Sequence, residues 1–312
     1  MEPASTAPER RRFLLVSNPV AGRTGNALIA SVVRALIARG ATVTQVPDGQ
    51  DMNGLKDGDA DKFRPARASA GGDGTVRAVG TILAGTPMPI GLIPRGTGNV
   101  LAEEIRLPRE PVKIARILMT GPCLSIPGAR INGEPFYLMA GIGFDGEIIQ
   151  RLDVATKRAA GKLAYVRPTL AALRLEDPAL TVEVDGAAHE AGWVLVSNAY
   201  RYGGSFRLTG KAGLEMDGLV AILIPRSGRL RRMVQLLALG AGRLEQVPGV
   251  KILPARRIKV TAARPVAVEV DGDDFGAAPV EIVWGEPVLP LIVPQSYANR
   301  WAAAHASPSP HS

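Results

Sequence analysis

The sequence predicts an α/β domain with a mostly parallel sheet and flanking helices, followed by a mainly antiparallel β-sandwich domain. Two observations lead to this prediction. In the first part of the chain, short apolar segments alternate with segments that carry a helical apolar stripe, a pattern typical of a parallel sheet covered by helices. After about residue 122, short apolar segments follow one another at close spacing, as in antiparallel sandwiches.

The first domain, expected over residues 1–122, is predicted element by element from apolar spacing and turn residues. Gly40 lies where a helix would end, Pro111 where the last helix would begin, and Gly121 where it would stop. The predicted elements are a strand at 13–17, a helix at 28–37, a strand and helix around 71–83, a strand at 90–93 and a helix at 111–120.

One stretch of the first domain departs from this pattern. Residues 47–67 mix charged and turn residues without periodicity, where a compact α/β unit should supply a helix and a buried strand. The small residues at 66–70 lack the apolar character of a central strand. A divergent loop and a disturbed reading frame are both open interpretations.

The second domain is expected over residues 123–294, and residues 295–312 as a short terminal helix (295–306) and tail that packs back on the first domain. Each predicted strand is a short apolar or alternating segment bounded by turn residues. These strands are predicted at 136–140, 181–184, 193–197, 219–224, 258–261, 266–270 and 280–284.

Composition narrows the classes of function. A single cysteine, Cys123, excludes an internal disulfide framework and a cysteine-based zinc site, and we expect it to be buried. The longest apolar runs fall short of a bilayer span, and the N-terminus lacks the pattern of a secretory signal. We therefore expect a cytoplasmic protein, with peripheral contact at the inner face of the membrane as an open alternative.

The net charge of +8 favours anionic partners, although an ordinary basic surface explains it equally well. Nucleic acid is the least favoured partner, because no basic stretch is interleaved with aromatic residues. A nucleotide or an anionic membrane surface fits better.

Three glycine-bearing polar loops, at residues 18–22, 71–75 and 94–99, follow predicted strands of the first domain. Such loops lie at the carboxyl ends of parallel strands, where open α/β sheets bind ligands, and their backbone N–H groups can cradle phosphate. Asp73 would repel a polyphosphate unless a divalent cation lies between them, so it suggests a magnesium nucleotide. The alternative is a glycine-rich tight turn with Asp73 and Thr75 as helix caps.

Six motifs in this order resemble the diacylglycerol kinase catalytic family, which includes bacterial lipid kinases and sphingosine kinases. The motifs are Asn18-Pro-x-x-Gly22, Gly71-Gly-Asp-Gly-Thr75, Pro94-x-Gly-Thr-Gly-Asn99, Gly141-x-Gly-Phe-Asp145, Leu214-x-x-Asp-Gly-Leu219 and Val270-Asp-Gly272. The second motif alone is shared with NAD kinases and, loosely, phosphofructokinases, whose α/β fold the first domain would then resemble. The resemblance covers nearly the whole chain.

The resemblance implies ATP and Mg²⁺ as cofactors and assigns residues to them. A structural Mg²⁺ would be held by the carboxylate of Asp217 and the backbone carbonyls of Leu214 and Leu219. The family's nucleotide-contacting Thr after the second strand has no clear match around residues 44–48. The implied ATP site comprises Asn18, Pro19, Val20, Ala21, Gly22, Gly71, Gly72, Asp73, Gly74, Thr75, Val76, Arg77, Ala78, Gly96, Thr97, Gly98 and Asn99.

The catalytic candidates follow a motif that occurs twice. Val-Glu-Val-Asp-Gly stands at residues 182–186 and 268–272, and the residues alone do not rank the two copies. The resemblance selects the second, because the family's Asp-Gly-Glu stands in this C-terminal place. Asp273 replaces that Glu and would be the general base, with Asp271 as its supporting or substitute acid.

The resemblance implies an ATP-dependent lipid kinase that transfers the γ-phosphate to the hydroxyl of a diacylglycerol-like acceptor. Two alternatives stay open: a kinase of a soluble acceptor, as in NAD kinases, and a non-catalytic lipid- or nucleotide-binding relative. The oligomeric state is also open, with a homodimer among the expectations.

A basic segment in the second domain bears on membrane contact. Four arginines, Arg226, Arg229, Arg231 and Arg232, precede the apolar Met233, Leu236, Leu237 and Leu239. Such a segment can dock on anionic lipid headgroups. The simpler interpretation, which we favour, is a helix packed on the core with its arginines in solvent.

Overall fold

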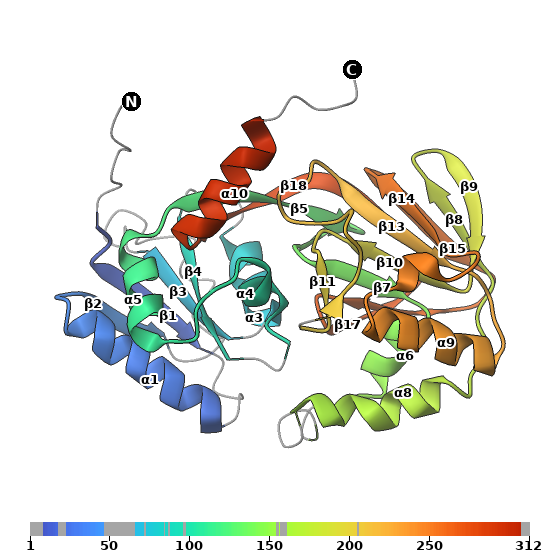
Figure 1. Ribbon diagram of the computed structural model, residues 1–312, viewed down its shortest axis with the longest axis horizontal. Coiled ribbons are helices and arrows are strands. Elements are labelled where there is room, and N and C mark those ends of the chain that lie inside the picture. The colour runs from blue at the N-terminus through green and yellow to red at the C-terminus, as the bar shows by residue number, and fades with distance from the viewer. Residues whose placement is uncertain are drawn as a thin grey trace. The chain divides into compact units, whose positions relative to one another are not determined.

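A computed structural model describes residues 9–17, 23–46, 66–71, 73–83, 85–86, 88–95, 98–153, 156, 161–204 and 206–306. The chain divides into two compact units: unit 1 comprises residues 1–126 and 288–312, and unit 2 comprises residues 127–287. Figure 1 labels the elements of both units. Each unit is described by itself.

Unit 1 contains a parallel sheet in the order β2-β1-β3-β4, with the end of β18 beside β4. Leu14 and Val16 of β1 are buried like Phe13 and Leu15, as expected of a strand covered on both faces. The strands are β1 (Arg12–Ser17), β2 (Thr42–Val46), β3 (Ala66–Gly71), β4 (Ile90–Pro94) and β18 (Val280–Ile292).

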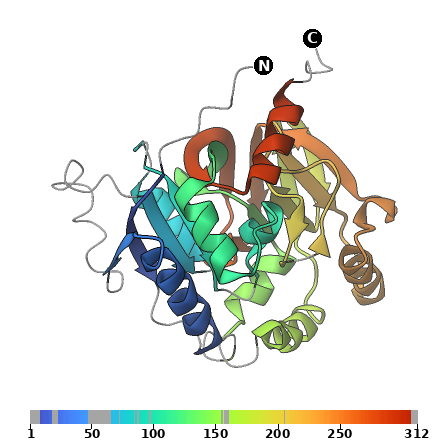
Figure 2. The ribbon, with the colours of Figure 1, turned by 60° about the vertical axis from the view of Figure 1, so that its left-hand side comes forward.

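Helices α1 (Arg23–Ile37) and α5 (Pro111–Thr120) pack together on this sheet (Figure 2). Their buried faces join Phe13 and Leu15 of β1 and Ile292 of β18 in one apolar core. The predicted turn residues behave as expected, since Gly40 has a φ of 79° and Pro111 opens α5. The other helices of unit 1 are α3 (Asp73–Ile82), α4 (Val100–Glu104) and α10 (Gln295–Ala306).

The strand β3 is the central strand that the sequence pattern made doubtful. Residues 66–70 pair in parallel with Phe13–Ser17 of β1, and residues 67–71 pair with Ile90–Pro94 of β4. Because β3 has a neighbour on each side, its backbone N–H and C=O groups are bonded in both directions, and this outweighs the weak strand propensity of its small residues. Residues 47–65 lie outside the described part of the chain.

Unit 2 is a β-sandwich of two sheets (Figure 1). One sheet is antiparallel in the order β14-β13-β10-β7-β16-β17; in the other, β9, β8, β15 and the start of β18 are neighbours, and β5 pairs with β6 and β18. The strands not yet bounded are β5 (Cys123–Ile131), β6 (Glu134–Phe136), β7 (Met139–Ile142), β8 (Leu180–Val184), β9 (Ala187–Ala191), β10 (Trp193–Ser197), β13 (Leu219–Ile224), β14 (Lys251–Ala255), β15 (Arg257–Ala262), β16 (Ala267–Val270) and β17 (Asp273–Ala277).

The core of unit 2 lies between the two sheets. Alternate residues of the strands, such as Val182 and Val184 of β8 and Val268 and Val270 of β16, point into it. Other secondary structure in unit 2 comprises α6 (Phe144–Gln150), the 3₁₀ turn η1 (Gly161–Tyr165), α8 (Val166–Ala172), the two-stranded β11 (Arg201–Tyr202) and β12 (Phe206–Arg207), α9 (Arg229–Gly240) and η2 (Leu244–Gln246).

The helix α10 covers part of unit 1, where Tyr297 is buried and the guanidinium of Arg300 donates to the carbonyl of Glu104 over 3.1 Å. Cys123 is exposed at the start of β5, so the expectation of a buried thiol was wrong. The reason is its place on the outer side of the strand, where its neighbour Ile126 and not Cys123 reaches the core. Among the described residues, no helix is both long and apolar enough to cross a bilayer.

Candidate functional site

The β3–α3 turn in unit 1 is tied to the loop that follows β4. Asp73, the first residue of α3, accepts hydrogen bonds from the backbone N–H groups of Val100 (2.9 Å) and Leu101 (3.1 Å). These N–H groups begin α4, so Asp73 caps that helix from across the turn. Two of the three predicted loops are thus held side by side, with Gly98 also next to the carboxylate of Asp73.

In this arrangement the negative charge of Asp73 repels a polyphosphate less than the sequence suggests. Both of its carboxylate oxygens accept backbone N–H groups, so its charge is partly balanced within the protein. The cavity beside Asp73 and Asn99 measures about 10 Å³, which admits about one water molecule and not a phosphate. An anion at the start of α3 therefore has to approach from the turn itself.

The remaining predicted ATP-site residues fall into three groups. Gly74, Thr75, Val76, Arg77 and Ala78 lie in the first turns of α3, and Val76 is buried, so that only its backbone can face a ligand. Gly71 ends β3, and Asn99 adopts a left-handed conformation (φ 49°) before α4. The predicted residues Asn18, Pro19, Val20, Ala21, Gly22, Gly72, Gly96 and Thr97 lie outside the described part of the chain.

Arg95 adds a positive charge to the loop after β4. Partial burial lowers the pKa of its guanidinium, which nevertheless remains charged at every physiological pH. Arg77 lies on α3 at the other loop. Arg95 was not among the predicted site residues, although a basic residue directly after a buried strand is the signal that could have identified it.

Asp271 in unit 2 is a hub for backbone hydrogen bonds. Its carboxylate accepts the N–H groups of Tyr137, Leu138 and Met139, each at 3.0 Å, while its own N–H donates to the carbonyl of Met139 at 2.9 Å. Asp271 and Gly272 both have positive φ, 50° and 86°, as in a type I′ hairpin turn between β16 and β17. Its side chain is buried and fastens this turn to the start of β7.

The other copy of the repeated motif folds in the same way. Asp185 and Gly186 form a turn with φ values of 47° and 88° between β8 and β9, and Asp185 accepts the N–H groups of Arg256 and Arg257. The repeated Asp-Gly thus forms a β-hairpin turn in both places. The copies differ in their Glu, because Glu183 is exposed on β8 whereas Glu269 is buried on β16.

Asp273, the predicted general base, opens β17 opposite Val270. Its side chain is exposed, and no partner is found for it among the described residues. The adjacent Asp274 is engaged, since its Oδ1 accepts the side-chain amide of Gln150 (3.2 Å) and the N–H of Gly276 (3.1 Å). Of the acids in this turn, Asp273 is therefore the one with a carboxylate available to a substrate.

A buried carboxyl pair lies behind this turn. Asp145 on α6 accepts a hydrogen bond from the hydroxyl of Tyr202 (2.8 Å), and Glu269 accepts the N–H of Gly272 (2.9 Å). Burial raises the pKa of Asp145 to about 7, against which the Tyr202 hydrogen bond acts. Burial and then the charge of Asp145 hold the pKa of Glu269 well above its usual range. The pair therefore retains a proton near neutral pH.

Gly141 of β7 explains how the carboxyl of Asp145 on α6 and that of Glu269 on β16 fit close together. A Cβ at Gly141 would stand 2.7 Å from the Cβ of Asp145 and 2.9 Å from Oε1 of Glu269, closer than real atoms approach. The first glycine of the Gly141-x-Gly-Phe-Asp145 motif thus makes room for the pair. The motif is visible in the sequence, but the pairing of Asp145 with Glu269 is not, because the burial of Glu269 depends on the packing of α6 on β16.

The predicted metal ligands lie together in the turn before β13. Leu214 and Leu219 are buried and flank Asp217, which is mostly exposed. The carboxylate of Asp217 pairs with the guanidinium of Arg256 at 2.5 Å. A hard cation prefers several oxygen ligands, and here the one carboxylate is already neutralised by an arginine. As they stand in this structure, these residues fit a divalent cation poorly.

Comparison with known proteins identifies two family domains. Residues 12–129 match the diacylglycerol kinase catalytic domain, and residues 139–296 match the YegS C-terminal NAD kinase beta sandwich-like domain. The two matches cover the parallel sheet of unit 1 and most of the sandwich of unit 2. The order of the two domains is the one that the motifs predict.

Relatives share sequence along most of the chain. A diacylglycerol kinase of Mycobacterium tuberculosis is 28% identical over 295 residues, which are 90% of this chain and 94% of that protein. One of Bacillus subtilis is 28% identical over 242 residues, covering 74% and 78%. An uncharacterised Synechocystis protein is 29% identical over 241 residues, and the chain spans about half (55%) of its length.

The fold agrees with a solved structure. The crystal structure of a diacylglycerol kinase from Bacillus anthracis superposes with a TM-score of 0.72 at 20% identity, over 93% of this chain and 99% of that one. At this identity the likeness concerns the fold alone.

Proposed function

This chain belongs to the family that joins a diacylglycerol kinase catalytic domain to a YegS-type sandwich domain, and from this membership we propose that it is an ATP-dependent lipid kinase. The proposed reaction transfers the γ-phosphate of ATP to a hydroxyl of a diacylglycerol-like lipid. The acceptor oxygen bonds to the γ-phosphorus, the bond from that phosphorus to the β–γ bridging oxygen breaks, and ADP leaves.

We assign the phosphate-binding end to unit 1. The backbone between β3 and α3 and the N-terminus of α3 would hold the phosphates, with positive charge from Arg77 and Arg95. The contacts of Asp73 with Val100 and Leu101 support this, because they hold the two glycine-bearing loops in fixed register. The loop at 18–22 would complete the site.

Asp273 would accept the proton of the lipid hydroxyl as it attacks. Its carboxylate is exposed and has no partner in the described part of the chain, as a general base requires before the substrate binds. Asp271 would be a positioning residue, because both of its oxygens are occupied by backbone N–H groups and keep the turn in place. This favours the supporting role for Asp271 over the role of substitute acid.

ATP would enter as its magnesium complex, which offsets the charge of the phosphates during transfer. A separate structural Mg²⁺ on Asp217, Leu214 and Leu219 stays a prediction, and Arg256 would have to leave Asp217 for it to bind. No step of the proposed reaction depends on that second ion.

The observation that carries this proposal is the match of both family domains, in order, to a chain in which Asp273 is exposed and has no partner among the residues that the structure describes. Incubating the protein with γ-labelled ATP and vesicles that contain diacylglycerol, phosphatidylglycerol or a sphingoid base should label a lipid. NAD in a parallel reaction tests the soluble-acceptor alternative. Label in NADP only, or nucleotide binding without transfer to any acceptor, would contradict the proposal.

A further inference from the structure

The helix α9 has a polar face and an apolar face, and its polar face is the one that packs against the rest of unit 2. Arg232 is 2% exposed: it pairs with Asp177 at 2.7 Å and donates to the carbonyls of Ala172 and Leu175. Gln235, also buried, accepts from the hydroxyl of Ser227 at 3.1 Å. Only Leu239 adds a buried leucine to this face. Polar contacts, more than apolar packing, fix α9 to unit 2.

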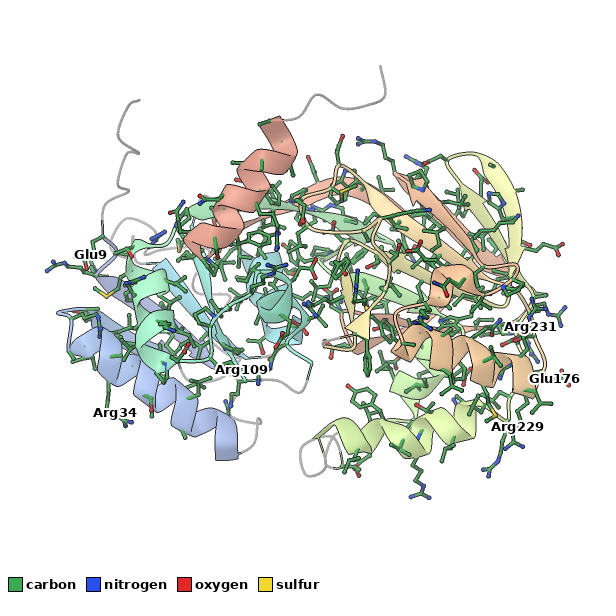
Figure 3. The ribbon with its side chains drawn as sticks, in the orientation of Figure 1. Glu9, Arg34, Arg109, Glu176, Arg229 and Arg231 are labelled. Atoms are coloured by element: carbon green, nitrogen blue, oxygen red, sulfur yellow. The ribbon has the colours of Figure 1, made fainter. Side chains whose placement is uncertain are left out.

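The outward face of α9 is apolar. Its side chains at helical spacing are Leu230 (80% exposed), Met233 (43%), Val234 (56%) and Leu237 (72%). With 3.6 residues per turn, Arg229 and Arg231 fall on the two edges of this stripe, and α9 contains no acidic residue. Figure 3 shows Arg229 and Arg231 extending from this part of unit 2.

A second apolar stripe lies next to α9. Arg232 joins α9 to the end of α8 through the carbonyls of Ala172 and Leu175. On η1 and α8, Leu163 (75% exposed), Val166 (52%) and Leu170 (54%) share one helical face with the exposed Arg167. Single exposed leucines are common on protein surfaces, but seven large apolar side chains on two adjoining segments are not.

We propose that the outward face of α9, defined as Leu230, Met233, Val234 and Leu237 with Arg229 and Arg231, docks on an anionic lipid bilayer. Interfacial helices combine an apolar stripe with flanking cations in this way, so that leucines enter the acyl boundary while guanidinium groups remain at the phosphates. The stripe on α8 extends the same contact.

Charge decides between a bilayer and a second copy of the chain as the occupant. An isologous contact would bring two faces of the same positive charge together, and α9 supplies no carboxylate to pair with Arg229 and Arg231 of the other copy. An anionic bilayer supplies the opposite charge along the whole stripe.

The sequence alone left docking and core packing open. In the structure Arg226, Arg229 and Arg231 are exposed, as the core-packing alternative expected, whereas Arg232 is buried. Of the apolar residues expected in the core, Leu239 is buried but Met233 and Leu237 are exposed.

Docking through α9 would place the proposed lipid kinase on a bilayer, but docking and kinase activity are tested independently. Binding is measured without ATP and on vesicles without an acceptor lipid, so that a protein inactive as a kinase can still bind. The measurement is co-sedimentation with vesicles of phosphatidylcholine alone and of phosphatidylcholine mixed with phosphatidylglycerol. We expect binding to the mixed vesicles only, weakened by salt.

Two variants test the two parts of the face. Leu230→Gln with Leu237→Gln should weaken vesicle binding at least about tenfold, because both side chains lose their apolar insertion. Arg229→Gln should weaken it about fivefold and reduce its salt dependence. All three residues are exposed, so thermal unfolding should be unchanged.

The matched control is Ile37→Gln with Val112→Gln, two apolar side chains that are 56% and 53% exposed on α1 and α5 of unit 1. This control should bind vesicles like the parent protein. The proposal is overturned if the parent protein does not bind anionic vesicles, or if the control and the Leu230/Leu237 variant lose binding equally. It is also overturned if the Leu230/Leu237 variant converts a dimer to a monomer in sedimentation velocity while vesicle binding is unchanged.

Discussion

Asp271 and Asp185 occupy the same place in two copies of one five-residue motif, and each uses its carboxylate to hold backbone N–H groups. Asp271 holds three such groups in a buried site, whereas Asp185 holds those of Arg256 and Arg257 at the surface. The consequence of losing each carboxylate should therefore differ, since an unpaired N–H costs much more where water cannot replace the lost acceptor.

We expect Asp271→Ala to lower the free energy of unfolding by about 3 kcal/mol or more, because three buried N–H groups lose their acceptor. Asp185→Ala, the matched control, should cost about 1 kcal/mol. Urea denaturation of both variants measures the difference. Equal losses would mean that burial of the Asp271 turn contributes nothing to its stability.

For the repeated motif, the sequence predicts the turn but not the side-chain contacts of its acidic residues. Asp-Gly after an alternating segment indicates a hairpin turn, and both turns form. Asp273 has no partner among the described residues, whereas Asp274 contacts Gln150 and Asp271 contacts residues 137–139. These partners lie more than a hundred residues away in the chain, so local pattern cannot reveal them.

At the scale of elements, α6 packs on β16 and brings the carboxyls of Asp145 and Glu269 close together, with Gly141 of β7 making room for both. In the unfolded chain both groups ionise near pH 4. In the folded protein the pKa of Asp145 is about 7 and that of Glu269 is also raised, so the folded state holds more protons across this range. Stability should therefore fall as the pH rises from about 4 through 7.

Glu269→Gln removes one of the two charges and should flatten this dependence. Relative to the parent protein, the variant should gain stability between about pH 5 and pH 8, because the remaining Asp145 no longer faces a second carboxylate. The control is Glu183→Gln, the exposed equivalent in the other copy of the motif, which should leave the profile unchanged. Chemical denaturation across this pH range measures both. Parallel profiles for all three proteins would contradict the account.

Apolar periodicity and turn residues predict some elements correctly, whereas contacts that are distant in sequence decide others. The apolar segment at 219–224 and the Pro111 helix form where their periodicity and turn residues place them. The central position of β3 could not be predicted, because its small residues gain their strand conformation from two neighbours. Which face of α9 is buried could not be predicted either, because Asp177 and the carbonyls of α8 select Arg232 for the inside.

At the scale of the whole molecule, the net charge of +8 and the two family domains are both consistent with a protein that works at an anionic lipid surface. The proposed transfer to a lipid hydroxyl would gain from attraction of a basic protein to an anionic bilayer. The fold class was predictable because the two domains have distinct apolar periodicities and turn residues bound their strands and helices. The ion pair of Asp217 with Arg256 was not predictable, because the two residues are 39 positions apart in the sequence.

The central claim is that Asp273 is the base of a lipid kinase, and one comparison of variants tests it most directly. The measurement is the turnover number with ATP and the lipid acceptor for Asp273→Asn, Asp273→Glu and Asp274→Asn. Asp273→Asn should lose a factor of about 10²–10⁴ in kcat, with thermal unfolding unchanged because its side chain is exposed. Asp273→Glu keeps a carboxylate and should remain active, and Asp274→Asn should behave like the parent protein. Undiminished transfer to lipid by Asp273→Asn would contradict the claim.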